Sequence, residues 1–143
     1  MRRVLNAMGV DRDGLPALDA AALDSPQGRV QIDGIGTDAV HLRNIGDGVT
    51  PGEIWRAVVE ATTDEVTKLH NSMTDIVGKH REIIVTGGWS HSAALMAAKR
   101  RRLGALQPSP VYEAGARGAA IYAGRAAGVL KSDGVFPGPM VHA

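Results

Sequence analysis

A pair of glycines, Gly87 and Gly88, stands between a β-like segment and a helical segment in this sequence. The β-like segment 82–86 has an apolar centre, and the helical segment begins at Ala93. This order predicts a strand that turns directly into a helix, as in a parallel β-α unit. Glycine leaves the backbone bare, and the unpaired N–H groups of a helix N-terminus can then approach a phosphate or nucleotide. A plain β-α turn without a ligand is the alternative.

Composition excludes several classes of protein. A chain of 143 residues is long enough for one domain with a core, and its lack of cysteine excludes disulfides and thiolate metal sites. A net charge of +1 gives no argument for nucleic-acid binding. No apolar run reaches the roughly 18 residues of a membrane span. The apolar segment that follows the first three residues is too short and too polar for the core of a signal peptide. We expect a cytoplasmic protein that binds neither nucleic acid nor membrane.

Hydrophobic periodicity predicts helices and short strands in alternation. The clearest element is a long helix that begins after Thr50 with a capping box to Glu53 and Pro51 at its first position, and that stops at Gly78. The residues after it predict an α/β fold with parallel strands in the second half of the chain. Helices are expected at 3–8, 15–23, 51–77, 92–103 and 114–127, and strands at 29–32, 40–45, 82–86 and 111–112, with 107–110 as a connector.

Other polar features favour structural roles. Arg56 and Glu60 are spaced for a contact along one helix, and Trp55 is expected in the core. The basic run 99–102 lies at a helix C-terminus, where cations are favoured, so a solvated face is preferred over a phosphate contact. The histidines lack metal-ligand spacing, and no serine, histidine and aspartate set can be assembled. We therefore expect neither a metal site nor a catalytic residue in this chain.

A second small-residue block follows the glycine pair by about two dozen residues. It begins at Glu113 and continues through Gly118 and Ala119 into a helix rich in glycine and alanine. Such a helix can lie very close to a neighbouring backbone or to a flat ligand. Tight packing of the helix on a sheet is the alternative to a ligand site.

Taken together, three motifs resemble the C-terminal, ATP-binding domain of the FGGY carbohydrate kinases, in the actin-like ATPase superfamily. They are Gly-Gly-x-Ser-x-Ser at 87–92, Glu-x-x-x-x-Gly-Ala-Ala at 113–120, and the helix segment 56–61, where Ala61 replaces the final glycine of the usual Arg-Ala-x-x-Glu-Gly. The resemblance covers residues 28–131. It implies an α/β, ribonuclease H-like fold with a mixed sheet and packed helices, lacking its opening strands. Residues 1–131 would form this partial domain, and 132–143 a poorly ordered tail.

The resemblance also implies a site for ATP, with Mg²⁺ held through the nucleotide. Gly87 and Gly88 would form the adenosine loop, with Gly88 against the phosphates or ribose. Ser92 would face the adenine, and Trp89 would stack on the base or plug the cleft. The second block would frame a wall of the same pocket. The implied nucleotide-binding residues are Gly87, Gly88, Trp89, Ser92, Glu113, Gly118 and Ala119.

Several motifs of the family are not found in this sequence. They are the phosphate loop and sugar pocket of the N-terminal domain, its aspartate general base, and the second phosphate loop that opens the C-terminal domain. Phosphoryl transfer requires phosphates, metal and acceptor held in line. We therefore expect the chain to bind ATP or ADP without phosphorylating a sugar by itself.

Two interpretations stay open. The chain is either the nucleotide-binding lobe of a sugar or polyol kinase, as a fragment or as half of a split enzyme, or a non-catalytic nucleotide-binding or assembly module derived from a kinase. Missing strands predict an exposed sheet edge or apolar face. We expect this surface to make the chain a homo-oligomer or to dock on a complementary N-terminal lobe.

Overall fold

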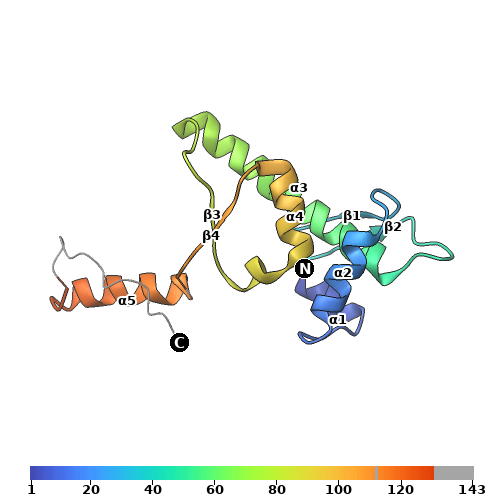
Figure 1. Cartoon of the computed structure of the whole chain (residues 1–143), viewed down its shortest axis with the longest axis horizontal. Coiled ribbons are helices and arrows are strands. Elements are labelled where there is room, and N and C mark those ends of the chain that lie inside the picture. Colours follow the sequence, from blue (N-terminus) through green and yellow to red (C-terminus); the bar gives the residue numbers. More distant parts are fainter. Residues whose placement is uncertain (112, 131–143) are drawn as a thin grey trace.

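The structure, a computed structural model, describes residues 1–111 and 113–130. It combines packed helices with two small sheets (Figure 1). The predicted tail 132–143 lies outside the described residues. The elements are, in chain order, α1 (Arg2–Ala7), α2 (Leu15–Asp24), β1 (Gln31–Asp33), β2 (His41–Arg43), α3 (Pro51–Val77), β3 (Ile84–Val85), the 3₁₀ helix η1 (Gly88–His91), α4 (Ala93–Leu103), β4 (Gln107–Pro108) and α5 (Ala114–Ala126).

The long helix α3 forms as its capping signals predict. Thr50 Oγ1 accepts a hydrogen bond from Glu53 N at 3.3 Å, and Glu53 Oε2 accepts one from Thr50 N at 2.8 Å. This backbone N–H holds the pKa of Glu53 below its usual value, assisted by the Thr50 hydroxyl and Arg29. At the other end Gly78 adopts a φ of +84°, and its N–H donates to Thr74 O at 2.8 Å. The predicted bounds of this helix are confirmed.

The core lies where α2, α3 and α4 pack against one another. Trp55, Val58 and Ala98 are fully buried at its centre, and Leu18 of α2 and Leu95 of α4 close it from two sides. Burial of these apolar side chains is the main favourable contribution to the packing. Trp55 is therefore in the core, as the sequence predicts.

The strands form two separate sheets rather than the single mixed sheet that was expected. β1 and β2 pair antiparallel, with Ile32 opposite Leu42, and β3 pairs parallel with β4. The parallel pairing in the second half of the chain is confirmed. The predicted strand 82–86 is shorter, since β3 contains only Ile84 and Val85, and it is not buried, since Ile84 is 56% exposed.

The fourth strand occupies residues that were predicted to be a connector. Gln107 N donates to Ile83 O at 2.9 Å, and Ser109 N donates to Val85 O at 2.8 Å. Pro108 lies between these two donors, at the position whose missing N–H would point away from β3, so proline is tolerated there. The prediction of a strand at 111–112 is wrong for Val111, which lies outside the strands, and Tyr112 is not among the described residues.

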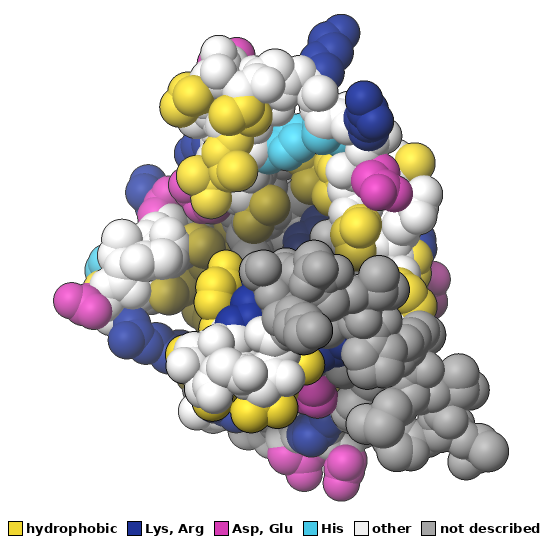
Figure 2. All heavy atoms as spheres, turned by 90° about the vertical axis from the view of Figure 1, so that its left-hand side faces the viewer, with side chains coloured by type: hydrophobic (Ala, Val, Ile, Leu, Met, Phe, Trp, Pro, Cys, Tyr) yellow, Lys and Arg dark blue, Asp and Glu magenta, His cyan; other side chains and the backbone are white. Residues whose placement is uncertain are grey.

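Two helical segments project from the core. α5 stands apart beyond β3 and β4 (Figure 1), and none of its residues is buried. The last turns of α3 extend past α4, and hydrophobic side chains gather on the surface near this end (Figure 2). None of the helices in the described part of the chain is long and apolar enough to cross a membrane.

Gly52 permits the close approach of α2 and α3, and its replacement tests this contact. A Cβ at Gly52 would lie 2.8 Å from Ala21 O and 2.7 Å from Ser25 Oγ. We expect Gly52→Ala to lower the free energy of unfolding by about 1–3 kcal/mol, because the two helices have to separate. Gly46→Ala is the matched control, since a Cβ there meets nothing within 4 Å. Equal stability of the two variants in urea denaturation would contradict the close contact.

Candidate functional site

The glycine pair forms a tight turn at the end of β3. Gly87 has a φ of +89° and a ψ of 170°, a conformation that is readily available only to glycine. Ser90 closes the turn, because its N–H and its hydroxyl both donate to Gly87 O, at 3.0 and 2.7 Å. A Cβ at Gly88 would meet nothing within 4 Å, so the backbone there is open to a ligand.

One turn of 3₁₀ helix separates the glycine pair from α4. The sequence predicts that the pair turns straight into the helix, but η1 comes first and α4 begins at Ala93. The glycine backbone therefore lies at the start of η1 rather than directly at the α4 N-terminus. The N-terminal end of α4 is capped by Ser92, whose Oγ accepts from Leu95 N at 3.2 Å.

Ser92 faces the protein core in this structure. Its residue exposure is 2%, and its hydroxyl donates to Asp19 Oδ1 at 3.0 Å. The same oxygen of Asp19 accepts the indole N–H of Trp55 at 2.7 Å. Asp19 is itself 4% exposed, so one buried carboxylate joins α2, α3 and the start of α4. These bonds hold the end of the glycine turn against the core.

Sequence reasoning missed Asp19 as part of this region. The available signal was an acidic residue between alanines and leucines in the segment 15–23, which is otherwise almost entirely apolar. A carboxylate on such a face has to find hydrogen-bond donors when it is buried. Its partners are 36 and 73 residues away in the sequence, so the pattern alone could not name them.

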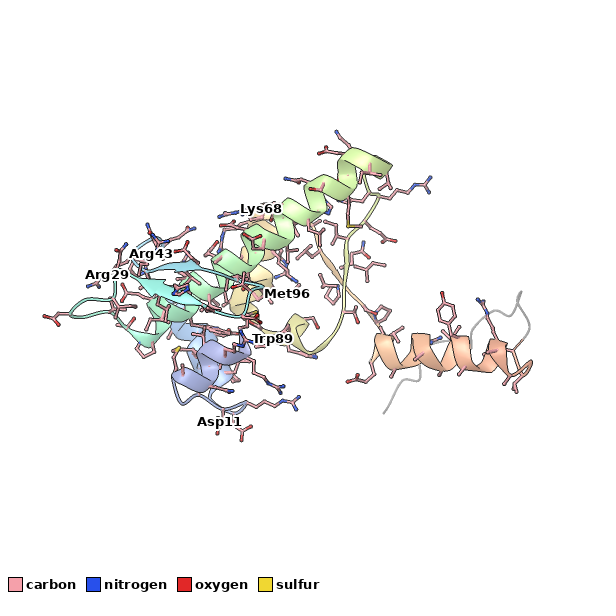
Figure 3. All side chains as sticks on the ribbon, turned by 180° about the vertical axis from the view of Figure 1, so that it is seen from behind. Asp11, Arg29, Arg43, Lys68, Trp89 and Met96 are labelled. Carbon is pink, nitrogen blue, oxygen red and sulfur yellow. The ribbon has the colours of Figure 1, made fainter. Side chains whose placement is uncertain are left out.

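Trp89 lies in η1, on the side of the turn that faces the core (Figure 3). Its ring centroid is 6.2 Å from that of Trp55, with an angle of 37° between the ring planes, and the residue is 37% exposed. The side chain therefore packs against a core residue while part of it reaches solvent. Stacking on a base stays a prediction.

The second predicted block lies on a different part of the molecule. Glu113 is the N-cap of α5 with a φ of +51°, and Gly118 and Ala119 lie within that helix. Because α5 stands apart from η1 in Figure 1, the described structure does not bring these residues to the glycine turn. The alternative of tight helix–sheet packing is not seen either, since a Cβ at Gly118 would meet nothing within 4 Å.

Ion pairs fasten the other end of α4 to α3. Glu60 forms ion pairs with Arg101 and with Arg102, the latter at 3.7 Å, and Arg102 Nε donates to Asp64 Oδ1 at 2.9 Å. That bond raises the pKa of Arg102. The predicted contact between Arg56 and Glu60 is confirmed at 3.9 Å. Half of the basic run is therefore engaged with α3 rather than forming only a solvated face.

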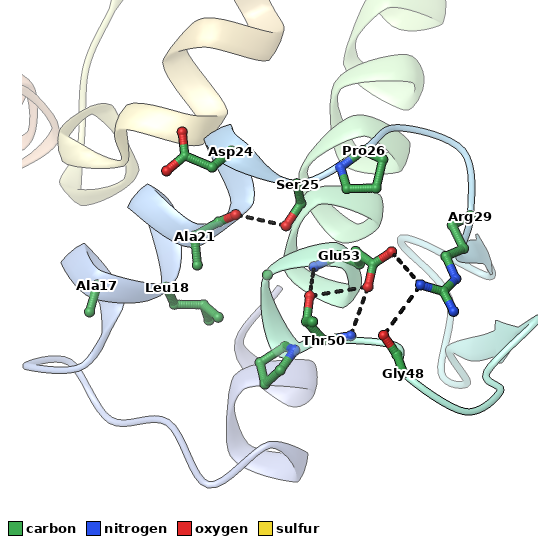
Figure 4. Close-up of a pocket in the computed structure, with 12 residues that line it drawn as sticks. Ala17, Leu18, Ala21, Asp24, Ser25, Pro26, Arg29, Gly48, Thr50 and Glu53 are labelled. Carbon is green, nitrogen blue, oxygen red and sulfur yellow. Dashed lines mark hydrogen bonds and ion pairs between the residues drawn. The ribbon is translucent and has the colours of Figure 1, made fainter.

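A pocket of about 660 Å³ lies between α2 and the start of α3 (Figure 4). Its apolar wall includes Leu18 and Pro26, and the α3 capping box borders it. Arg29 at its rim is already bound to Asp47 O at 2.9 Å, to Gly48 O at 3.3 Å and to Glu53. The polar groups here serve the fold, and the pocket lies away from the glycine turn. Nowhere in 1–111 or 113–130 do three or more histidine, cysteine or acidic residues form a group that could hold a metal.

Comparison with known proteins relates the fold to part of a sugar kinase. The sequence matches no protein-family model, and no curated protein matches it. Among solved structures, the chain is similar to xylulose kinase from Rhodospirillum rubrum, with a TM-score of 0.56 and 20% sequence identity. The similarity covers 69% of this chain and 23% of that chain, so it spans about a quarter of the kinase. At this identity the likeness shows a shared fold, that of a kinase-like α/β domain.

Among the polar groups near the glycine turn, we expect the Asp19 carboxylate to contribute most to stability. Asp19→Ala leaves the indole N–H of Trp55 and the hydroxyl of Ser92 without their buried acceptor. We expect a loss of about 2–4 kcal/mol in the free energy of unfolding. Asp24→Ala is the control, since Asp24 lies on the same helix but is exposed. Chemical denaturation followed by tryptophan fluorescence measures both, and a loss no larger than that of the control would rule out the structural role of Asp19.

Proposed function

We propose that this chain is the nucleotide-binding lobe of an ATP-dependent carbohydrate kinase of the FGGY type, which binds ATP or ADP but does not phosphorylate a sugar by itself. The observation that carries the proposal is the coincidence of a kinase-like fold with an open glycine turn after β3. The three FGGY-like motifs support it, because their order and spacing along the chain resemble those of the family.

The turn has the properties that a nucleotide loop needs. The bare backbone of Gly87 and Gly88 allows a ribose or phosphate to approach within hydrogen-bonding distance. Trp89 offers part of an aromatic ring beside the turn, and stacking on such a surface suits any base. Mg²⁺ bound to the phosphates would neutralise part of their charge. Ser92 and Asp19 act as positioning residues, since both are buried behind the turn.

Phosphoryl transfer requires parts that this chain does not provide. The sugar site, the general base and the phosphate loops of the family find no counterpart in the sequence. Catalysis in this reaction comes chiefly from positioning and charge neutralisation, so one wall of the nucleotide site contributes little alone. We propose that a complementary N-terminal lobe supplies the remaining parts.

A second candidate is a non-catalytic nucleotide-binding or assembly module derived from a kinase. It is favoured by the large exposed apolar side chains at the end of α3, among them Ile76 and Val77. Such a surface is expected of a chain whose main role is to associate with other chains.

Nucleotide binding tests the site directly. We expect ATP with Mg²⁺ to bind in calorimetry and to change the tryptophan fluorescence through Trp89. Gly88→Asp should weaken binding by at least about tenfold, because a carboxylate would then face the phosphates. Gly46→Asp is the matched control. A Cβ at Gly46 would also meet nothing within 4 Å, and this glycine lies in a different segment of the chain, before α3. Absence of binding at millimolar ATP, or equal binding by both variants, would refute the site.

Reconstitution separates the two candidates. If the chain is a kinase lobe, co-expression with the N-terminal lobe of a carbohydrate kinase should give ADP release that depends on a sugar or polyol. The same mixture carrying Gly88→Asp should release little ADP. Folded but inactive mixtures across a panel of sugars would favour the non-catalytic module instead.

A further inference from the structure

The hydroxyl group behind the glycine turn is already bonded within the protein. Ser92 Oγ donates to Asp19 Oδ1 at 3.0 Å and accepts from Leu95 N at 3.2 Å. A hydroxyl has a single hydrogen to donate, and that hydrogen is used in the bond to Asp19. Ser92 is also 2% exposed, so its side chain lies beneath the surface. Ser92 therefore offers no hydrogen-bond donor to a molecule bound at the turn.

The side chains of the turn that reach solvent are of two kinds. Trp89 is 37% exposed, so part of its aromatic ring is accessible (Figure 3). Thr86 and His91 are exposed polar side chains that precede and follow the glycine pair in the sequence. Ser90 is half-buried, and its hydroxyl donates to Gly87 O at 2.7 Å. A nucleotide base at the turn would thus meet aromatic surface and solvated polar groups.

Such surroundings discriminate weakly between bases. Strong discrimination requires buried polar groups that lose their partner when the wrong ligand binds. The exposed side chains of Thr86 and His91 keep water as a partner whichever base is bound. Stacking on an aromatic ring also discriminates little, because every base has a π-face. The base would therefore add to the affinity without determining which nucleotide binds.

The phosphates of a nucleotide would interact with the turn more strongly than its base. Hydrogen bonds from backbone N–H groups to a charged oxygen are roughly twice as strong as those between neutral groups. A Cβ at Gly87 or Gly88 would meet nothing within 4 Å, so a phosphate can approach the backbone there without obstruction. The phosphates are common to all nucleoside triphosphates.

We infer that the proposed nucleotide site selects its ligand by the phosphates and accepts purine and pyrimidine nucleoside triphosphates alike. The base stacks on the accessible part of Trp89, and the phosphates lie against the backbone of Gly87 and Gly88. This selectivity, which rests on the nucleotide binding proposed above, widens the substrate class from ATP to nucleoside triphosphates in general.

Calorimetry of the full chain with a set of nucleotides tests this selectivity. With Mg²⁺ present, ATP, GTP and CTP should have dissociation constants within about fivefold of one another. Adenosine, which lacks the phosphates, should bind at least about tenfold more weakly than ATP. A preference of more than about fivefold for any one base, or adenosine within about tenfold of ATP, would overturn the inference and leave the nucleotide site in place. Absence of binding by all three triphosphates would refute both.

Substitution of Trp89 tests the stacking contact. Trp89→Ala should weaken ATP, GTP and CTP by a similar factor of about five, because it removes the aromatic surface. Inorganic triphosphate has no base, so its affinity should fall by less than about twofold. Trp89→Phe is the matched variant, since it keeps an aromatic ring, and it should bind all three nucleotides more tightly than Trp89→Ala. An equal loss for inorganic triphosphate would mean that Trp89 shapes the turn without contacting the base, and would overturn the stacking.

Two further substitutions test whether a polar side chain recognises the base. Ser92→Ala removes the hydroxyl that is bonded to Asp19, and His91→Ala removes the exposed imidazole beside it. Each should change the affinities for ATP and GTP by the same factor, so that their ratio stays constant. A change of more than about threefold in that ratio would show that the substituted side chain recognises the base, which contradicts the inference.

Discussion

One buried carboxylate sets the arrangement on which the rest of the structure depends. Asp19 lies on α2, and its Oδ1 accepts from Trp55 of α3 and from Ser92 at the start of α4. Burying a carboxylate without hydrogen-bond donors is strongly unfavourable. The three helices must therefore lie where Trp55 and Ser92 can both donate to Asp19. At the far end of α4, Arg101 and Arg102 bind Glu60 of α3. Helix α4 is therefore held against the rest of the structure at both of its ends. Because the glycine turn is joined to α4 by the single turn η1, this anchoring also positions the turn.

The sequence predicted the parts of the fold that depend on neighbouring residues. The α3 capping box, the stop at Gly78 and the helix after Ser92 all follow from residues within a few positions of one another. It did not predict features that depend on distant contacts. The position of β4 is set by Ile83 and Val85, some two dozen residues earlier. The partners of Asp19 belong to two other helices, so periodicity carries no signal for them.

In the candidate site, too, the sequence predicted the local feature but not the long-range contacts. A glycine pair after a strand identified a turn with open backbone, and the structure contains that turn. The resemblance added Glu113, Gly118 and Ala119, but these lie on α5, apart from the turn. In the described structure no residue of α5 is buried, so α5 is not part of the packed core that holds η1. The family motifs describe residues that come together in a complete domain. For Glu113 and Gly118 to reach the glycine turn in this chain, α5 would need a surface against which to pack.

The exposed apolar end of α3, with Leu69, Met73 and Ile76, is linked to the glycine turn through the chain. The end of α3 passes through Gly78 into β3, and β3 leads into Gly87. β3 pairs with only two residues of β4, and a two-stranded sheet of this size contributes little stability. Any chain that covers this end of α3 would hold it still, and with it the start of β3. If a nucleotide binds as proposed, less entropy would then be lost when it orders the turn. Association and the proposed nucleotide binding would strengthen each other, because such coupling is reciprocal. The half-covered α3 helix is thus the physical reason to expect that the proposed nucleotide site depends on a second chain.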